Sequence, residues 1–440
     1  MITGFSTITP STEPSNRFPY VHKYRVEVLT RVRQSAQTTF ASLTVRNFRL
    51  FFGGQFISQV GNWLTTIAQS LLVLHITHNN GIAMGGLAAC QYLPVLVFGS
   101  WAGVVTDRQN KRRMLIIVQA LAMAQSFMLA GLIFAGHPAL IAIYAIAAFG
   151  GLTTAFGNPP RRSLVVEMVP EELVQNAVSL NSALMTSARI FGPALAGLLV
   201  ITVGYGWCFA IDGISYLAVI WGLWRMNISE ILSSERTEKA KGQIRAGFSY
   251  IRSVHELFVP FVMMGVVGTL AFNFGTILPL FVKKTFHGSD TNFTILYSVL
   301  SIGSLLGALV TARRRTISVR SVANAAALFG FSLAILAAAP SMWTAYPLGI
   351  FMGFSGVVFM TASTAIVQMR TDTQMRGRVL ALQAMVFLGS TPIGGPIMGI
   401  ICQLWSPRAA LLVGAVACWW ASAWGVRHQN SVSDPSQAIV

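Results

Sequence analysis

The chain has 440 residues, of which 10% are charged and 54% are hydrophobic, and its formal net charge is +17. A soluble domain carries roughly 25% charged residues, so this composition excludes an ordinary soluble protein and indicates an integral membrane protein. The basic residues lie mainly in short segments between apolar stretches, where they set membrane topology, so the net charge does not indicate nucleic-acid binding.

Residues 1–40 are polar, contain Pro10, Pro14 and Pro19, and have no apolar central region. A secretory signal peptide requires an apolar central region of about 7–15 residues. We therefore expect residues 1–45 to form a cytoplasmic N-terminal tail rather than a signal peptide.

Twelve mainly apolar stretches follow, each long enough for a helix to cross a bilayer core about 30 Å thick. Lipid offers no hydrogen bonds to the backbone, so each stretch must be helical. The sequence predicts an all-α membrane protein with twelve transmembrane helices. They lie at residues 49–75, 82–105, 114–135, 138–160, 176–203, 206–225, 257–282, 291–312, 320–339, 342–368, 378–403 and 407–426.

The distribution of Lys and Arg sets the orientation of these helices. With the N-terminus in the cytoplasm, the inner segments carry 27 of the 31 Lys and Arg residues, and the outer loops carry three. Basic residues are retained on the cytoplasmic side, so both termini are predicted to be cytoplasmic. We expect a multi-pass protein of the cytoplasmic membrane of a bacterium, in contact with membrane lipids.

The longest predicted inner loop divides the helices into two sets of six. The predicted segments are a first bundle at residues 46–225, a cytoplasmic linker at 226–256, a second bundle at 257–428 and a cytoplasmic tail at 429–440. Each half has a polar loop that leads into a helix with a Gly-Pro step, Gly192-Pro193 in the first half and Gly395-Pro396 in the second. Six plus six helices with internal similarity indicate two pseudo-symmetric bundles with a substrate path between them.

The linker contains a candidate amphipathic helix. Ile244, Phe248 and Ile251 share one helical face, and basic residues lie mostly elsewhere on the helix. This pattern is typical of a helix that rests on a membrane surface. We therefore expect this segment to lie on the inner leaflet.

The predicted helix at 49–75 carries a polar stripe at spacing i, i+4, i+7, i+11 and i+14. Its members are Gln55, Gln59, Asn62, Thr66 and Gln69. At 100° per residue they lie within about 80° of one another around the helix axis. Such a stripe is costly against lipid, so it either lines a substrate cavity or makes hydrogen bonds to neighbouring helices. We take the cavity as the hypothesis to test.

Three other predicted helices carry shorter polar sets. They are Thr154 and Asn158; Thr269, Asn273 and Thr276; and Thr361, Thr364 and Gln368. Threonine and asparagine also pack between membrane helices, so cavity lining and interhelical hydrogen bonding both stay open. The candidates we take for the cavity are Asn158, Asn273, Thr364 and Gln368.

Two charged residues, Arg189 and Asp212, lie well inside the predicted spans. Charges within a membrane are costly and are usually paired or functional. The two residues lie on consecutive helices at different depths, so a direct contact requires the Arg side chain to reach outward. A structural pair, two separate charges, and a proton-coupling or substrate-contact site all stay open. Asp212 is the leading candidate for a proton-binding acid.

The sequence has no motif for a metal, a cofactor or an enzyme activity. The four cysteines form no pattern of metal ligands, and neither HExxH nor the phosphate loop GxxxxGK[ST] occurs. Metal and nucleotide sites need such spacings because their ligands must converge on one ion or one phosphate chain. We therefore expect a protein that is not an enzyme and binds neither metal nor cofactor.

The segment after the second predicted helix reads Gly103-x3-Asp107-Arg108-x2-Lys111-Arg112. A glycine permits the close approach of another helix, and the acid and the cations can meet helix ends, opposite charges or lipid headgroups. This segment resembles the signature loop between the second and third helices of the major facilitator superfamily. The resemblance implies a loop that braces one bundle against the other, with Asp107 as a gate residue that meets the start of the eleventh helix.

Four further segments resemble the multidrug and siderophore exporters of this superfamily, which include the enterobactin exporter and the macrolide efflux pumps. They are Arg46-Asn47-Phe48-Arg49, Pro159-Pro160-Arg161-Arg162-Ser163-Leu164, Asn176-Ala177-Val178-Ser179-Leu180-Asn181-Ser182 and Ala188-Arg189-Ile190-Phe191-Gly192-Pro193-Ala194-Leu195-Ala196-Gly197. The last segment resembles the antiporter motif of the fifth helix, with Ser179 and Ala188 in place of two upstream glycines. The intramembrane Arg that many proton–drug antiporters carry in the fourth helix is absent.

The resemblance implies a monomeric secondary transporter that exports a drug or a siderophore-like metabolite against proton entry. Gly192, Pro193, Gly197, Gly395 and Pro396 would then serve close helix packing. A polar and nearly uncharged cavity favours a neutral or amphiphilic small molecule. A lipid or lysolipid flippase and an importer on the same fold stay open as alternatives.

Overall fold

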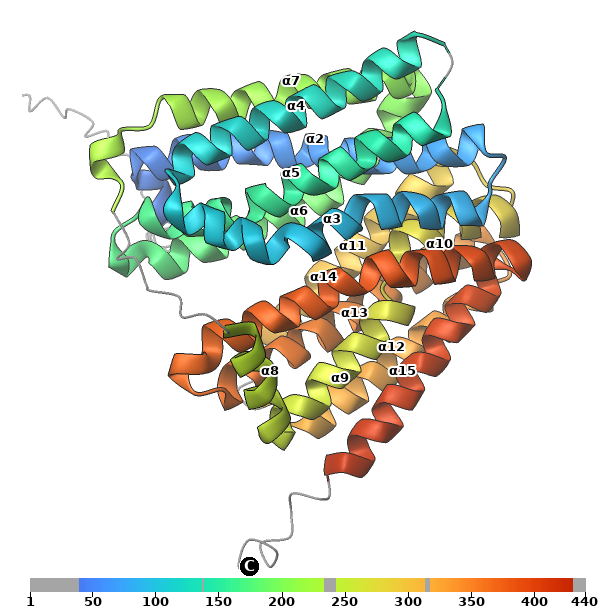
Figure 1. Ribbon diagram of the computed structural model, residues 1–440. Coiled ribbons are helices and arrows are strands. Elements are labelled where there is room, and N and C mark those ends of the chain that lie inside the picture. Colours follow the sequence, from blue (N-terminus) through green and yellow to red (C-terminus); the bar gives the residue numbers. More distant parts are fainter. Residues whose placement is uncertain (1–38, 137, 233–242, 313–316, 430–440) are drawn as a thin grey trace, which may run out of the picture.

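The computed structural model describes residues 39–136, 138–232, 243–312 and 317–429. Within these ranges all regular elements are helical, as the apolar stretches predict. The helices form two bundles, one above the other in Figure 1.

The first bundle contains six long helices. They are α2 (Arg46–Ile76), α3 (Gly81–Arg108), α4 (Lys111–Phe134), α5 (Leu140–Glu167), α6 (Val174–Thr202) and α7 (Gly204–Trp224), with short 3-10 turns at Ala41–Thr44, Glu171–Leu173 and Ile228–Glu230. Asparagine side chains begin two of them. The Oδ1 of Asn80 accepts hydrogen bonds from two N–H groups of α3, and that of Asn110 accepts one from α4. Such caps satisfy N–H groups that have no partner within the helix.

The second bundle repeats this arrangement. Its helices are α9 (His255–Leu270), α10 (Phe274–Leu280), α11 (Asp290–Ala312), α12 (Val319–Ala337), α13 (Met342–Arg370), α14 (Thr373–Leu404) and α15 (Pro407–Gln429), with a π-helical turn at Phe281–Thr285. Ser318 and Ser341 begin α12 and α13, and each forms a capping box with the residue three positions later. These reciprocal hydrogen bonds fix the two helix starts.

The segment predicted as one continuous helix at residues 257–282 is broken. α9 ends at Leu270, and α10 begins at Phe274. Asn273 spans the break, since its Nδ2 donates to the backbone oxygen of Thr269 over 2.7 Å. The apolar run hides this interruption, because hydropathy does not report backbone geometry. Discontinuous helices of this kind are typical of transporter binding sites.

Equivalent helices pair in the same way in the two bundles. In the first bundle α2 packs against α6 and α7, α3 against α5, and α4 against α5 and α7. In the second bundle α9 packs against α14 and α15, α11 against α13, and α12 against α13 and α15. The two sets correspond helix by helix, in agreement with the internal repeat predicted from the sequence.

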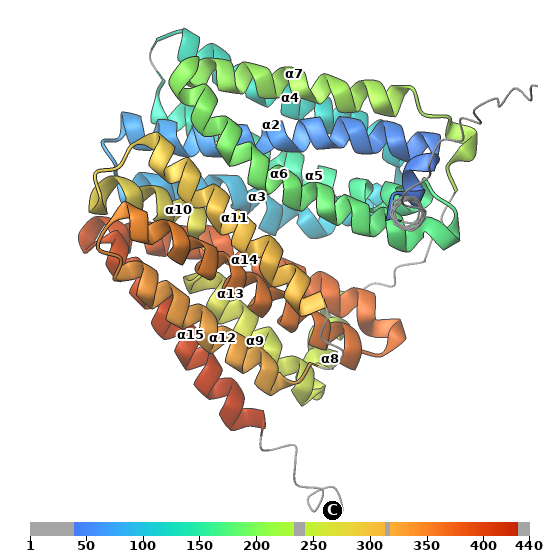
Figure 2. The ribbon, with the colours of Figure 1, turned by 180° about the vertical axis from the view of Figure 1, so that it is seen from behind.

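The two bundles meet at one end and diverge toward the other (Figures 1 and 2). Contacts between them run along α3 with α14 and α6 with α11, which are equivalent pairs under the pseudo-symmetry. We call the end where α3 begins and α14 ends the closed end. The other end, where α2 begins and α15 ends, is the diverging end.

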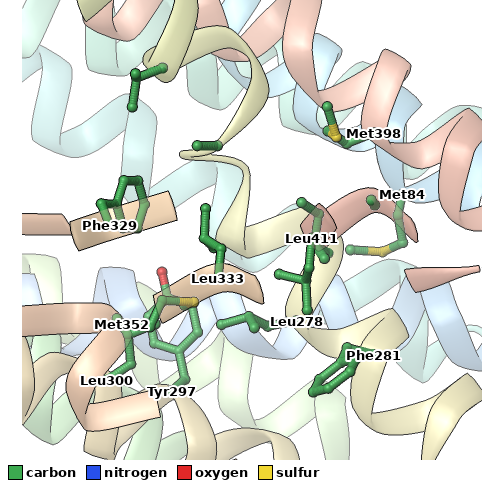
Figure 3. Close-up of a cluster of buried hydrophobic side chains, with 14 of the residues drawn as sticks. Met84, Leu278, Phe281, Tyr297, Leu300, Phe329, Leu333, Met352, Met398 and Leu411 are labelled. Carbon is green, nitrogen blue, oxygen red and sulfur yellow. The ribbon is translucent and has the colours of Figure 1, made fainter. Parts of the chain in front are cut away.

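The apolar core follows the same division. One buried cluster contains side chains of both bundles, and Figure 3 shows Met84 of α3 with Met398, Phe281 and Leu411 of the second bundle. A second cluster, around Phe48 at the diverging end, contains side chains of the first bundle and the segments beside it. Buried apolar side chains therefore connect the two bundles at the closed end. The diverging end of the first bundle has a separate core.

The predicted linker contains helix α8 (Gln243–Ser253). It packs against α9 and α14, with Ile251 buried and the ring of Phe248 5.8 Å from that of Phe261. The side chain of Ile244 lies outside the part that the structure describes. Part of the apolar face of α8 therefore packs on the second bundle, and its position on the inner leaflet stays a prediction.

Eleven helical segments of the described chain are long and apolar enough to cross a membrane. The broken segment α9–α10 counts as one of them. The helix α2 is not among them, although it has 31 residues. Its polar stripe lowers its mean hydropathy, which is the feature that singled it out as a functional helix. With α2, the twelve predicted stretches are all found as helical segments.

Candidate substrate site between the two bundles

Both ends of the polar stripe on α2 are buried. Gln69 accepts a hydrogen bond at Oε1 from the Nε2 of Gln91 on α3, over 3.0 Å, so this end serves contact between helices. Gln55 is buried at the other end, and neither atom of its amide has a hydrogen-bond partner among the described residues. An unpaired buried polar group costs about 1–3 kcal/mol, which favours a ligand or a second conformation that satisfies this amide.

The middle of the stripe is more accessible. Asn62 is exposed, and Gln59 and Thr66 are half-buried. The Nδ2 of Asn62 is 3.5 Å from the hydroxyl of Tyr216, which is a weak hydrogen bond, and Thr66 donates only to its own helix. These three side chains retain most of their capacity to bind a polar ligand.

Two glycines position α6 between the bundles. A Cβ at Gly192 would overlap the Cβ of Trp63 on α2, and a Cβ at Gly197 would overlap Thr294 on α11. At 100° per residue these glycines point about 140° apart, and Arg189 points between them. Arg189 lies about 22 Å from the first residue of α6, near the middle of the helix. It therefore faces the region between α2 and α11 at mid-depth.

Arg189 lies among aromatic side chains of both bundles. Its guanidinium carbon is 5.5 Å from the ring centre of Trp63, and that ring lies 5.9 Å from the ring of Tyr297 on α11. Arg189 is also close enough to Tyr92 on α3 for its charge to act on both phenols. We call Arg189, Trp63, Tyr92 and Tyr297 the Arg189 cage. Of its members only Arg189 was a candidate from the sequence, because the aromatic members lie far apart along the chain.

Asp212 lies elsewhere, wholly buried inside the first bundle. Its Oδ2 accepts hydrogen bonds of 2.7 Å from Thr65 of α2 and Ser126 of α4, and Oδ1 is 3.4 Å from the hydroxyl of Ser215. A Cβ at Gly61 would lie 2.5 Å from Oδ1, so only glycine leaves room for the carboxylate there. Of the arrangements left open by the sequence, a direct pair of Arg189 and Asp212 is therefore wrong.

A line of hydroxyls on α6 leads from the diverging end toward Arg189. Ser179 and Ser182 are exposed and Thr186 is half-buried, at spacing i, i+3 and i+7 with Arg189 at i+10. Each hydroxyl donates to a backbone oxygen of its own helix, so its lone pairs stay available. The periodicity of this line was present in the sequence, and a search for polar stripes on every span would have found it.

The candidates on the second bundle differ in accessibility. Asn273 is buried at the helix break, and its Oδ1 has no hydrogen-bond partner among the described residues. Thr364 is half-buried and donates to the backbone of Met360, while Gln368 is exposed at the diverging end of α13. Of these, Asn273 combines the deepest position with an unused acceptor.

Asn158 on α5 is engaged within its own helix. Its Oδ1 accepts a hydrogen bond of 2.8 Å from Arg161, one turn later. A side chain held by a neighbouring guanidinium is less free to bind a ligand. Asn158 is therefore a weaker candidate than Asn62 for cavity lining.

The loop after α3 is only partly described. The structure does not describe the side chain of Asp107, nor those of Thr373 and Gln374, which begin α14. The gate contact implied for Asp107 therefore lies outside the described residues. Arg108 is exposed. No described atom lies within 4 Å of a Cβ placed at Gly103, so the close helix approach predicted there is wrong for this conformation. Gly103 lies toward the diverging end of α3, where the bundles have parted.

The basic residues that follow, Lys111 and Arg112, connect helices within the first bundle. Lys111 forms an ion pair with Glu167, the last residue of α5, and both side chains are mostly buried. Arg112 donates from Nε and Nη2 to the backbone oxygens of Leu223 and Trp224 at the end of α7. A cation at a helix C-terminus satisfies carbonyl groups that have no partner within the helix. These two residues thus hold three helix ends together.

Glycines allow the close contact at the closed end. A Cβ at Gly85 of α3 would lie 2.7 Å from the Cα of Pro396 and 2.9 Å from the oxygen of Gly395 on α14. A Cβ at Gly395 would in turn lie 2.7 Å from the Cβ of Ala88. Gly395 and Pro396 therefore lie at the interface between the bundles, where small residues let two backbones approach.

Polar contacts also join the bundles there. Among the described residues, hydrogen bonds cross between the bundles from Tyr205 to the Oδ2 of Asp290, over 3.0 Å, and from the backbone of Gly81 to Gln403, over 2.8 Å. Lys283 pairs with Asp290. A cavity of about 340 Å³ lies beside this pair. It is lined by Leu71, Leu74, His75, His78, Asn79, Tyr205, Lys283 and Asp290.

The described residues contain no group of three or more His, Cys, Asp or Glu side chains placed to hold a metal ion. The features that gather between the bundles are instead the α2 stripe, the α6 hydroxyls and the Arg189 cage. Such polar groups near mid-depth, in a two-bundle fold, are suited to hold a small molecule.

Residues 37–437 match the family of transmembrane secretion effectors, a branch of the major facilitator superfamily. The chain belongs to this family. Relatives include the staphyloferrin A transporter of Staphylococcus aureus, which is 26% identical over 60% of this chain and 66% of its own length. The macrolide efflux protein A of Streptococcus pyogenes is 22% identical over 79% of this chain and 87% of its own. The enterobactin exporter of Escherichia coli is 20% identical over 82% and 87%.

The match spans slightly less than two thirds of the staphyloferrin A transporter. Among solved structures, a bacterial homologue of the lysosomal transporter Spinster, in an inward-facing and occupied conformation, has a TM-score of 0.67 at 12% identity, covering 89% of this chain and 97% of the other. A POT family transporter in complex with 5-aminolevulinic acid has a TM-score of 0.72 at 10% identity, covering 88% and 97%. These likenesses show the major facilitator fold. The prediction of a member of the major facilitator superfamily with this fold is confirmed.

Proposed function

We propose that this protein is a secondary active transporter that exports a small amphiphilic molecule from a bacterial cytoplasm in exchange for protons. The names of its relatives support export, since one is a macrolide efflux protein and another an enterobactin exporter. Transport would follow alternating access, in which the two bundles part at one end of the molecule at a time.

The observation that carries this proposal is the arrangement of the bundles, joined at the closed end and parted at the other (Figure 1). The distribution of Lys and Arg supports a cytoplasmic position for the diverging end. An exporter must accept its substrate from that side, so this conformation is the loading state.

The groups at mid-depth support an amphiphilic substrate. Asn62 and Gln59 on α2 offer amide donors and acceptors, and Ser182 on α6 offers a hydroxyl. Trp63 and Tyr297 offer apolar ring surface beside them. A site of this mixed character binds a molecule that has both an apolar body and polar groups.

Asp212 is the proposed proton carrier. Its Oδ2 accepts hydrogen bonds from hydroxyls of α2 and α4, while Asp212 itself belongs to α7. Protonation removes the negative charge that these hydroxyls stabilise, and charge-assisted hydrogen bonds weaken when the charge is lost. The packing of three helices of the first bundle would therefore respond to the proton, which links proton binding to bundle geometry.

The test is accumulation of a panel of fluorescent and radiolabelled compounds, which includes a macrolide, in cells with and without the protein. Each measurement is repeated after a protonophore collapses the proton gradient. We expect lower accumulation of at least one amphiphilic compound in cells that contain the protein, and we expect this difference to vanish without the gradient.

The other outcomes identify the alternatives. Higher accumulation in cells with the protein would indicate an importer and overturn export. A difference that survives collapse of the gradient would overturn proton coupling. Altered exposure of lysolipid on the outer leaflet, with no effect on any panel compound, would indicate a flippase on the same fold.

A further inference from the structure

We infer that the Arg189 cage is a binding site for the carboxylate of an amphiphilic organic acid, and that the transported molecule carries such a group. The second part rests on the proposed transport function. The first part concerns binding alone and stands on the geometry of the cage.

Arg189 is a cation without a protein anion. Among the described residues it makes no ion pair and no hydrogen bond, and Asp212 is engaged by three hydroxyls inside the first bundle. A guanidinium stays charged at any physiological pH, and a charge at the middle of a membrane is costly unless it is paired or hydrated. An anion that enters from the diverging end would supply the missing partner.

Other arginines that lie over aromatic rings show the contrast. Arg408 lies over Phe286 and donates to the backbone oxygens of Ala337 and Ala339 over 3.0 and 2.8 Å. Arg225 lies over Trp221, but just past the end of α7. Arg189 alone among these three combines a position at mid-helix with a guanidinium whose donors are unused.

The chemistry around Arg189 fits a carboxylate attached to an apolar or aromatic body. A guanidinium binds a carboxylate through two parallel hydrogen bonds, and this geometry is specific to planar anions. The phenols of Tyr92 and Tyr297 bring hydroxyl donors to the same region, and no acidic residue belongs to the cage. The faces of Trp63 and Tyr297 offer a surface for a flat apolar group.

The cage joins both bundles. Trp63, Tyr92 and Arg189 belong to the first bundle, and Tyr297 belongs to the second. A ligand held by all four binds best in conformations that keep α6 and α11 together, so its binding free energy acts on the relative position of the bundles. The cavity that the sequence predicts as nearly uncharged would then have a positive centre, which favours acids over neutral molecules of the same shape.

The experiment measures binding of radiolabelled 2-naphthoate and of its methyl ester to the full-length protein in lipid nanodiscs. The acid and the ester share one apolar body and differ in charge. We expect the acid to bind with a Kd at least about tenfold below that of the ester, as one charge-assisted contact implies. Citrate, which has carboxylates but no apolar body, should compete weakly.

Variants identify the residue that causes the preference for the acid over the ester. Arg189→Gln should weaken binding of the acid roughly ten- to hundredfold and leave the ester nearly unchanged, and Arg189→Lys should fall between because it keeps the charge and loses the planar fork. Tyr297→Phe should cause a smaller loss. Arg225→Gln is the matched control, because it removes an equal charge from an equal Arg–Trp contact outside the cage. Thermal unfolding of each variant verifies that it is folded.

Equal affinity for acid and ester, equal losses in the Arg189 and Arg225 variants, or no saturable binding of the acid would each overturn the assignment. The assay needs no proton gradient and no movement of substrate. If binding depends on Arg189 but the protein exports nothing, the proposed transport is refuted and the assignment of the Arg189 cage stands. If the protein exports molecules without any preference for acids, the proposed transport stands and the role of the cage in it is refuted.

Discussion

The contact between α3 and α14 at the closed end predicts a strong effect of one methyl group. In Gly85→Ala the new Cβ would lie 2.7 Å from the Cα of Pro396 and 2.9 Å from the oxygen of Gly395. Both distances fall short of an ordinary contact of 3.4 Å, the first by about 0.7 Å. The neighbouring atoms belong to backbone, so no flexible side chain can move aside. The two helices must separate.

Overpacking of this kind costs about 1–3 kcal/mol. The cost arises only while α3 and α14 are in contact, so it falls on one conformation of the bundles and not on the folding of either bundle. A difference of that size changes the ratio of two conformations about 5- to 150-fold. We therefore expect Gly85→Ala to shift the protein from the form closed at this end toward the form open at this end, and to slow transport.

The assay is the distance between spin labels at Ala135 and Trp405, which are exposed at the closed end of the first and second bundles. The four native cysteines are first replaced. The Gly85→Ala protein should show a larger fraction of long distances than the wild type. Gly99→Ala is the control, because the same helix has no described atom within 4 Å of a Cβ at that position. An unchanged distance distribution in Gly85→Ala, or an equal shift in Gly99→Ala, would refute this account of the closed end.

Three further predictions concern charged residues. Asp212→Asn should abolish the dependence of transport on the proton gradient, measured as export from preloaded cells at several external pH values, and an unchanged pH dependence would leave Asp212 a structural residue. Asp107→Ala should impair transport and leave the amount of inserted protein unchanged in membrane fractions, whereas full transport would refute the gate role implied by resemblance. Glu167→Gln removes the partner of mostly buried Lys111 and should lower the free energy of unfolding by about 1–3 kcal/mol, seen as a lower Tm in detergent. A Tm equal to that of the wild type would show that the pair is neutral.

The helical segments could be predicted because each depends on its own residues. A run of about 20 apolar residues must form a helix in lipid, whatever its neighbours are. The polar stripe on α2 could be predicted for the same reason, because its spacing alone indicates that it avoids lipid. Locality also explains the missed break before Asn273. An apolar run has the same hydropathy whether its backbone is continuous or interrupted.

The Arg189 cage could not be predicted for the opposite reason. Its members lie on α2, α3, α6 and α11, and periodicity within one helix does not say which helix it faces. The two glycines of α6 decide this, since Gly192 receives Trp63 and Gly197 receives Thr294. Gly103 shows a second limit, because the conformation of the bundles decides whether a small residue there has a neighbour.

The helix α2 connects the two charged groups that the sequence singled out. Thr65 donates to Asp212 from one side of the helix, and Trp63, two residues earlier, lies beneath Arg189. Two residues turn a helix by about 200°, so these contacts lie on nearly opposite faces of α2. A proton that weakens the contact of Thr65 would free α2 to move, and any such movement carries Trp63 with it. The link requires Asp212→Asn to change the affinity of the cage for 2-naphthoate, although residue 212 touches no member of the cage. If that affinity were the same in Asp212→Asn and the wild type, proton and substrate would have to be coupled by a route other than α2.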